Sequence, residues 1–405
     1  MDFFSSRRKR AFFFSVLYLS EGAPIGFLWW ALPSVLRSQG IPVADITTLT
    51  SILVLPWAFK VLWAPAIDVL QHRWPLSRWI IASQLLMGIT LLPLLALDLH
   101  DQFSWVFGFL ALHSISAATQ DVAIDALCIR SANAEERGSL NGWMQAGMLT
   151  GRSLLGGGAL IAMDWVGFSG IVLLLLGVIW GSSLLLLFAR TPSPQDPSDR
   201  PPVSFPALVK TLQEVGRLRQ AAYVLMFAAI SGAGYEAVGS VAGPFLIDRG
   251  LTTGDVGWFF FVPAIVAMIA GSLIGGYYAD RIGRTASVRV FLTVMASAVL
   301  LIGILDIVAD GGLPAWHVAG MTLLYFSIGL FVSSSYAMMM DATHPSLAAT
   351  QFSAYMGATN LCESWSAFAV GRMQPAIGYP GAFILMGLVS FATLPLVKKL
   401  TTRNV

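Results

Sequence analysis

Charged side chains are scarce in this sequence. Asp, Glu, Lys and Arg together make up 11% of its 405 residues, whereas soluble domains carry about 25%. A soluble chain of this length would fold as two or three domains with charged surfaces, so the composition excludes a soluble fold. Hydrophobic residues make up 56% of the chain, which excludes intrinsic disorder. The remaining class is a membrane protein with many spans.

Several chemical signatures are also missing. The net charge is only +2, and no basic stripe is interleaved with stacking aromatics, so we expect no nucleic-acid binding. The sequence contains no zinc-type His/Cys cluster, no phosphate-binding loop and no nucleophile elbow. We therefore expect no metal, no cofactor, no ATP-driven step and no enzymatic activity. The two cysteines, Cys128 and Cys362, lie in or beside apolar runs, which favours small core residues over a disulfide.

Apolar runs recur along the whole chain. Each is long enough to cross about 30 Å of hydrocarbon as a helix, and only helices satisfy their own backbone polar groups in lipid when no barrel is formed. We expect an all-α membrane protein with twelve transmembrane helices, at about residues 11–36, 44–66, 79–97, 103–128, 139–162, 168–189, 221–247, 255–279, 285–308, 315–340, 348–371 and 376–397.

The basic residues predict the orientation of these helices. Of the 24 Lys and Arg residues, 19 fall on the side that holds both chain termini. The opposite side holds only Arg37, Arg249 and Arg372, while Lys60 and Arg152 lie inside runs. By the positive-inside rule, both termini are cytoplasmic. The sequence contains no Asn-x-Ser/Thr site, which fits a bacterial source, so we expect a multi-pass protein of a bacterial inner membrane.

The chain divides into two related halves. Residues 190–220 begin as a polar, Pro-rich linker and continue as an amphipathic helix over 203–219. This segment separates an N-terminal six-helix half, 1–189, from a C-terminal six-helix half, 221–405. Pro33-x-x-x-Arg37-x-x-Gly40 in the first half resembles Pro244-x-x-x-x-Arg249-Gly250 in the second, at an offset of 210 to 212 residues. Two pseudo-symmetric halves of this kind are typical of transporters that bind substrate near the membrane midplane.

A loop motif indicates a family. Gly276-Tyr-Tyr-Ala-Asp280-Arg281-Ile-Gly283-Arg284 is similar to the G-x-x-x-D-R-x-G-R signature of the major facilitator superfamily. The resemblance implies a gating motif in which the arginines pair with carboxylates; a solvated turn is the alternative. The first half carries a degenerate version that ends at Asp68.

A second resemblance covers roughly residues 20–160. Phe59-Lys60-Val-Leu-Trp63-Ala-Pro65, Gln120-Asp121-x-x-x-Asp125 and Gly156-Gly157-Gly158 look like segments of AmpG-type muropeptide permeases. Related permeases carry siderophores or acyl-CoA. The resemblance therefore implies transport, with a muropeptide or a siderophore as the solute.

Six ionisable residues fall well inside the predicted spans: Glu21, Lys60, Asp121, Arg152, Glu236 and Glu363. A charge at the centre of the membrane costs ~2.5–3.5 kcal/mol on insertion scales, so such residues normally face a cavity or a partner.

The buried carboxyls are candidates for proton coupling. Glu21, Glu236 and Asp121 can each load a proton, or else form a structural hydrogen bond to a neighbouring helix. Asp125 lies on the same helical face as Asp121, near the cytoplasmic end. We expect it to have a structural or gating role, and Arg130 and Arg137 are its candidate partners.

The basic residues allow two interpretations each. Arg152 either clamps a substrate carboxylate or phosphate or neutralises Asp121 or Glu21, whereas Lys60 is expected to snorkel to the interface. Further candidates for the lining of a substrate cavity are Glu363, Gln120, Asn141, Gln145, Asn360, Trp29 and Tyr355.

The sequence thus predicts a secondary transporter that works by alternating access. We expect a monomer that binds a mid-sized amphipathic solute and, through its buried carboxyls, protons. A muropeptide is the first substrate hypothesis and a siderophore the second. A membrane-embedded enzyme or a channel is disfavoured, because no catalytic pair is visible and the repeat with a gating motif argues against a static pore.

Overall fold

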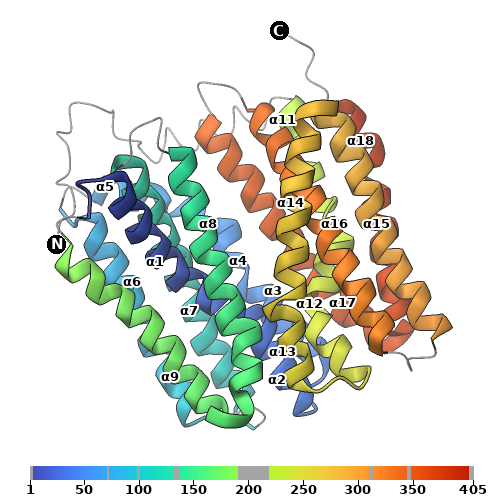
Figure 1. Cartoon of the computed structure of the whole chain (residues 1–405), viewed down its shortest axis with the longest axis horizontal. Helices are drawn as coiled ribbons and strands as arrows, with labels where there is room; N and C mark the ends of the chain where they lie inside the picture. Colours follow the sequence, from blue (N-terminus) through green and yellow to red (C-terminus); the bar gives the residue numbers. More distant parts are fainter. Residues whose placement is uncertain are drawn as a thin grey trace. The chain divides into compact units, whose positions relative to one another are not determined.

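The computed structural model describes residues 3–70, 73–97, 101–131, 137–189, 219–309, 314–343 and 348–400. Every regular element within these ranges is helical, which confirms the all-α prediction (Figure 1). The predicted linker and most of the amphipathic helix, residues 190–218, lie outside the described ranges.

Contacts divide the chain into two compact units. The first unit is Met1–Leu32 with Phe59–Leu208, and the second is Pro33–Ala58 with Val209–Val405. Residues 33–58 precede the predicted linker but belong to the second unit. The division into halves at 190–220 stays a prediction, because the units follow contacts and the halves follow the sequence repeat.

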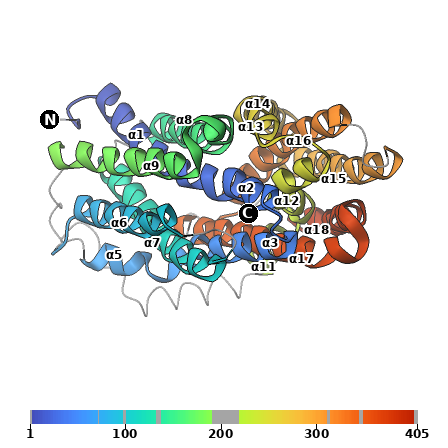
Figure 2. The same ribbon diagram turned by 90° about the horizontal axis from the view of Figure 1, so that it is seen from below.

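The first unit is built around α1. This helix lies beside α8 and α9 (Figure 2), and α6 packs against α7. The elements of this unit are α1 (Arg7–Gly26), η1 (Phe27–Ala31), η2 (Lys60–Leu62), α5 (Ala64–Leu70), α6 (Leu76–Leu91), η3 (Leu92–Leu95), α7 (Phe103–Ser131), α8 (Arg137–Ser153), η5 (Leu154–Gly158) and α9 (Ala159–Phe188).

The second unit is built around α14, α16 and α17. α14 and α15 pack against α16, while α12, α11 and α3 pack against α17. The elements are α2 (Leu32–Ser38), α3 (Val43–Leu53), α4 (Leu55–Phe59), α11 (Arg219–Ile230), α12 (Ala233–Asp248), α13 (Thr253–Phe261), α14 (Pro263–Ile282), α15 (Arg284–Val308), α16 (Pro314–Asp341), α17 (Ala348–Phe391) and α18 (Leu394–Lys399).

Nine helical segments in the described ranges are long and apolar enough to cross a membrane. Two of them, Gly142–Phe188 and Gln351–Lys399, are 47 and 49 residues long, whereas one crossing needs about 20 residues. Each contains a glycine with non-helical backbone, Gly167 with φ 67° and Gly378 with φ 68°. Each segment therefore holds two of the predicted spans. The full count of twelve stays a prediction.

The positive-φ glycines repeat along the chain. Gly167 and Gly378 lie 211 residues apart, and Gly40 (φ 86°) and Gly250 (φ 87°) lie 210 residues apart. Only glycine adopts such backbone angles readily. Because both pairs match the offset of the sequence repeat, the pseudo-symmetry extends to the chain turns.

Glycines also set the distance between helices. On α1 and α8, a Cβ atom at Gly22, Gly26, Gly147 or Gly151 would overlap the backbone of the facing helix. The spacing within each pair is four residues, the small-xxx-small pattern that lets membrane helices approach closely.

This geometry predicts a position-specific loss of stability. Gly151→Ala places a methyl group on the Leu19 carbonyl of α1, so we expect it to cost about 1–3 kcal/mol, as overpacking does elsewhere. Gly142→Ala is the matched control on the same helix, because nothing lies within 4 Å of its Cβ position. Thermal unfolding of the purified protein in detergent measures both. Equal unfolding temperatures for the two variants would contradict the close approach of α1 and α8.

Candidate functional site

Five polar side chains of the first unit form a group that we call the buried ionic cluster: Tyr18, Glu21, Lys60, Asp121 and Asp125. Lys60 of η2 forms an ion pair with Asp121 of α7, and Tyr18 of α1 donates a hydrogen bond to Asp125 of α7. Glu21 is 1% exposed and Asp121 is 5% exposed. The cluster therefore joins three elements deep inside the unit.

Glu21 completes the cluster from α1. Its carboxyl group lies within electrostatic reach of Asp121, Asp125 and Lys60, while its Oε2 atom is buried and has no hydrogen-bond partner among the described residues. Two ionised carboxyl groups buried near each other repel, so a proton on one of them is stabilising. This geometry supplies a place where a proton can be held.

One expectation about this region is wrong, and another is answered only in part. Lys60 does not snorkel, because it is paired with Asp121. Asp125 accepts its hydrogen bond from Tyr18, not from Arg130, which is exposed. Five helical positions separate Asp125 from Arg130, which places them on different faces of α7. The Arg137 side chain lies outside the described residues.

Arg152 lies apart from the cluster. Its guanidinium carbon is 4.4 Å from the centroid of the Trp30 ring, a cation–π stack. Arg152 forms no ion pair with any described residue, so it does not neutralise Asp121 or Glu21. Of the two interpretations of Arg152, the structure is compatible with the substrate clamp.

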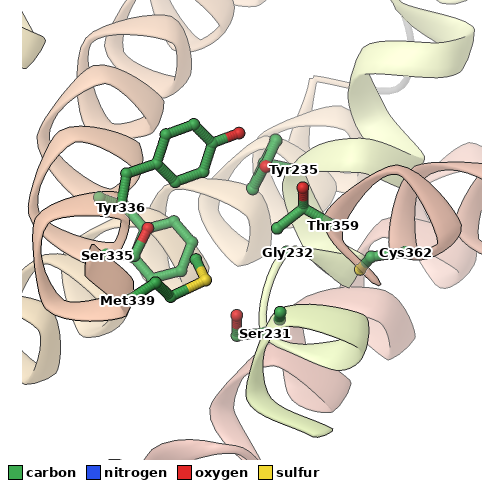
Figure 3. A pocket seen from close by; sticks show the side chains of 10 residues that line it. Ser231, Gly232, Tyr235, Ser335, Tyr336, Met339, Thr359 and Cys362 are labelled. Atoms are coloured by element: carbon green, nitrogen blue, oxygen red, sulfur yellow. The ribbon is translucent and has the colours of Figure 1, made fainter. Parts of the chain in front are cut away.

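The second unit contains a small pocket in which five of the ten lining residues carry a hydroxyl group. We call it the hydroxyl pocket; Figure 3 shows Tyr235, Tyr336 and Thr359 around one space. The Thr359 hydroxyl donates a hydrogen bond to the Met356 carbonyl at 2.8 Å. The cavity volume is about 10 Å³, which is room for one water molecule. Its other lining residues include Ser231, Gly232, Ser335, Met339 and Cys362.

Predicted carboxylates lie beside this pocket. Glu236 of α12 and Glu363 of α17 both act electrostatically on Tyr336 and Cys362. Cys362 is a free, buried cysteine, as predicted. Glu236 therefore belongs to a different unit from Glu21, and the two carboxylates do not form one site within a unit.

The remaining cavity candidates are dispersed. Gln120 is fully buried, and neither of its amide atoms has a hydrogen-bond partner in the described part of the chain; the same holds for the Tyr355 hydroxyl. Gln145 is exposed, whereas Trp29 and Asn360 are partly exposed. The side chains of Asn141 and Asp68 lie outside the described residues.

Of the two arginines of the loop motif, Arg284 forms the expected ion pairs. Gly283 turns the chain with φ 87°. The Arg284 guanidinium lies 2.5 Å from Asp280 and 2.9 Å from Asp341 of α16. Arg281 stacks on Tyr277 at 4.4 Å. Arg284 thus pairs with carboxylates and Arg281 with an aromatic ring. The gating role of the motif residues stays a prediction: Gly276, Asp280, Arg281, Gly283 and Arg284.

A second ionic network was not expected from the sequence. Arg249 lies between α12 and α13 and forms two hydrogen bonds with Asp306 of α15, at 2.5 and 2.6 Å. His317 of α16 lies 3.0 Å from the same carboxylate. Both Asp306 and His317 have side chains that are 1% exposed. The hydrogen bond to Asp306 raises the pKa of Arg249 above its usual value, so this guanidinium stays charged.

A neighbouring ion pair joins α2 to α12. Arg37 donates to Asp248 at 2.7 Å, and the Tyr379 hydroxyl of α17 donates to the same carboxylate at 2.8 Å. Arg37 and Arg249 are the two arginines of the sequence repeat. The repeat was therefore a usable signal for these positions, although it did not reveal their partners.

Removing one member of the buried pair is expected to destabilise the protein. Arg249→Met leaves the Asp306 carboxylate buried without its main counter-charge, and breaking such pairs costs about 3–5 kcal/mol. Arg284→Met is the matched control, because its partner Asp341 is 56% exposed and surface pairs contribute only about 0–1 kcal/mol. Thermal unfolding in detergent compares the two. A larger loss for Arg284→Met would show that burial does not govern these pairs.

Comparison with known proteins supports the expected family. The sequence model of the Major Facilitator Superfamily matches residues 14–371. The chain is 25% identical to the anhydromuropeptide permease of Escherichia coli K12 over 350 residues, 83% of this chain and 68% of the permease. It is 20% identical over 406 residues to putative transporter AmpG 4 of Rickettsia conorii, covering 97% of both chains.

Solved structures agree on the fold. A D-xylose-proton symporter superposes with a TM-score of 0.72 at 12% identity, covering 96% of this chain and 98% of the symporter. A nucleoside transporter superposes with a TM-score of 0.75 at 11% identity, covering 97% of this chain and 100% of the transporter. This chain has helices that are apolar and long enough to cross a membrane, and both the family model and the solved folds match over most of its length. The chain is therefore a multi-pass membrane protein that belongs to the Major Facilitator Superfamily and resembles AmpG-type permeases.

Proposed function

We propose that this chain is a proton-coupled importer of a muropeptide-like solute in a bacterial inner membrane, with both termini in the cytoplasm. Support for the solute comes from the anhydromuropeptide permease of E. coli and the AmpG relative. Support for the orientation comes from the 19 basic residues on one side. A monomer is proposed by analogy with the fold alone.

The observation that carries proton coupling is the buried ionic cluster. Its three carboxyl groups face a single ammonium group, that of Lys60. Unpaired charge in a low-dielectric interior is costly, so the cluster is most stable when protons neutralise the excess negative charge. A cluster of this kind loads a proton when it opens to one side and releases it when it opens to the other.

The ion pair offers a way to link the proton to movement. When a proton reaches Asp121, the Coulomb attraction that holds Lys60 disappears. The ammonium group can then turn toward Glu21 or Asp125, with which it also interacts electrostatically. Because Lys60 lies on η2 and Asp121 on α7, the change loosens one helix contact. Both halves can then alternate between two arrangements, as in other transporters with this symmetry.

Proton coupling predicts a separation between accumulation and exchange. Glu21→Gln and Asp121→Asn cannot load the proton, so we expect uptake driven by a proton gradient to fall by about tenfold or more, the effect of 1.4 kcal/mol. Exchange of solute without a gradient needs no proton movement and is expected to persist. Proteoliposomes with labelled anhydromuropeptide on one or both sides measure the two processes.

The controls identify the residue responsible. Asp164→Asn removes an exposed carboxylate of the same unit and should behave as the native protein. Glu236→Gln tests the carboxylate of the second unit as an alternative coupling site. Full gradient-driven accumulation by both cluster variants would sink the proposal, and uptake of a ferric siderophore in place of the muropeptide would favour the second substrate hypothesis.

A further inference from the structure

Arg152 is a cation at the middle of a membrane crossing. The segment that starts at Gly142 turns at Gly167, so Arg152 lies ten residues into a crossing of about 25 residues. A charged side chain at such a depth normally has a partner. Lys60 already compensates Asp121, and Arg152 has no ion-pair partner among the described residues.

The guanidinium group is held in a fixed position. One face lies on the ring of Trp30, 4.4 Å from its centroid, and Trp30 is itself only 2% exposed. A Cβ atom at Gly156 would lie 2.8 Å from the Trp30 ring, so a glycine is needed to seat the indole. The stack of Arg152 on Trp30, and Trp30 on Gly156, pre-organises the cation before any solute arrives.

The backbone is adapted at the same depth on both helices. Trp30 lies in the π-helix η1, and Arg152 is followed two residues later by the π-helix η5. These two π-helices pack against each other. π-helices are rare and occur frequently at functional sites, so their pairing beside the only unpaired mid-span cation in the described chain is an independent sign of a site.

One donor of the Arg152 guanidinium is buried without a partner among the described residues. Its Nε atom is buried and has no hydrogen-bond partner in the described ranges. Stacking uses the face of the guanidinium plane, whereas the N–H donors lie in that plane and point outward from its edge. An incoming carboxylate can therefore accept two parallel hydrogen bonds from one edge while Trp30 keeps its contact with the face.

We propose that Arg152, stacked on Trp30, binds a carboxylate of the transported solute, so that the substrate of this transporter is a carboxylic acid in its anionic form. One guanidinium balances the single charge of a carboxylate, whereas a phosphate dianion would leave one charge uncompensated. This inference rests on the proposed transport function and adds the chemical group that the site recognises. The carboxylate can come from the peptide or from the sugar part of a sugar–peptide.

Equilibrium binding tests the proposal without any gradient. The probes are an anhydromuropeptide, the same compound with its peptide carboxylates converted to methyl esters, and the compound esterified on the sugar acid where one is present. We expect the native protein to bind one ester about 10–100-fold more weakly than the free acid, the loss expected for one charge-assisted bidentate pair. The ester that loses affinity identifies the source of the carboxylate.

Variants show whether Arg152 is the partner. Arg152→Gln should bind the acid as weakly as the native protein binds the ester, because the guanidinium partner of the carboxylate is gone. It should no longer distinguish acid from ester, and the four affinities form a double-mutant cycle that measures the interaction of Arg152 with the carboxylate. Arg152→Lys keeps the charge but not the fork and should retain part of the discrimination. Trp30→Leu should weaken acid binding by severalfold. Arg130→Gln, an exposed arginine of the same unit, serves as the control.

The outcomes separate this inference from the proposed function. Equal binding of acid and esters by the native protein overturns the carboxylate site but leaves muropeptide transport standing. Discrimination that survives in Arg152→Gln also overturns it. A native protein that binds neither the anhydromuropeptide nor a carboxylate-bearing ferric siderophore overturns both proposals.

Discussion

A charged side chain in the hydrocarbon layer has no water to solvate it, so it must find its partner within the protein. This constraint explains why Lys60 is paired with Asp121. Buried charges near the ends of helices follow the same rule, since Arg249 is paired with Asp306 and Arg37 with Asp248. In each case the partners come from different parts of the chain, so each pair also fixes which elements are neighbours. Packing supplies the rest of the specificity. At several contacts the facing helix lies so close that only glycine, which has no Cβ atom, fits.

The pairs differ in how completely charge is balanced. In the outer network of the second unit, one carboxylate, Asp306, faces Arg249 and His317, so its charge is fully compensated. Such a network stabilises one arrangement of the helices. The buried ionic cluster of the first unit has three carboxyls and one lysine, and Arg152 has no counter-charge in the described chain. Uncompensated charge of this kind favours the binding of a proton or of a charged solute. We therefore propose that proton coupling and solute recognition both belong to the first unit.

The sequence predicted the architecture well, but it predicted few of the contacts between side chains. Hydropathy and turn glycines depend on local physics, so the all-helical fold, the repeat and the turn at Gly283 could be read directly. Helical spacing also gives depth and face, and it nominated Glu21, Asp121 and Arg152 correctly as buried or mid-span groups. It does not give the neighbouring helix. Lys60 was therefore expected at the interface, and Asp306 and His317 were overlooked because each lies near the end of an apolar run.

The two proposed sites together account for coupled movement. Glu21 lies on α1 five residues before Gly26, whose Cβ position would meet the Arg152 backbone, a rise of about 7.5 Å along the helix. Without ligands, the cluster carries excess negative charge and Arg152 carries excess positive charge, and no ion pair joins the two among the described residues. With all three carboxyls ionised, the cluster holds two negative charges in excess of Lys60, so protons on two of them neutralise it, and one carboxylate neutralises Arg152. Only the protein loaded with protons and with the solute carboxylate is free of uncompensated charge. The change from one open side to the other therefore costs the least free energy in this fully loaded state. Coupling of a proton to an anionic solute then follows from the cost of burying charge, without any direct contact between the two ligands.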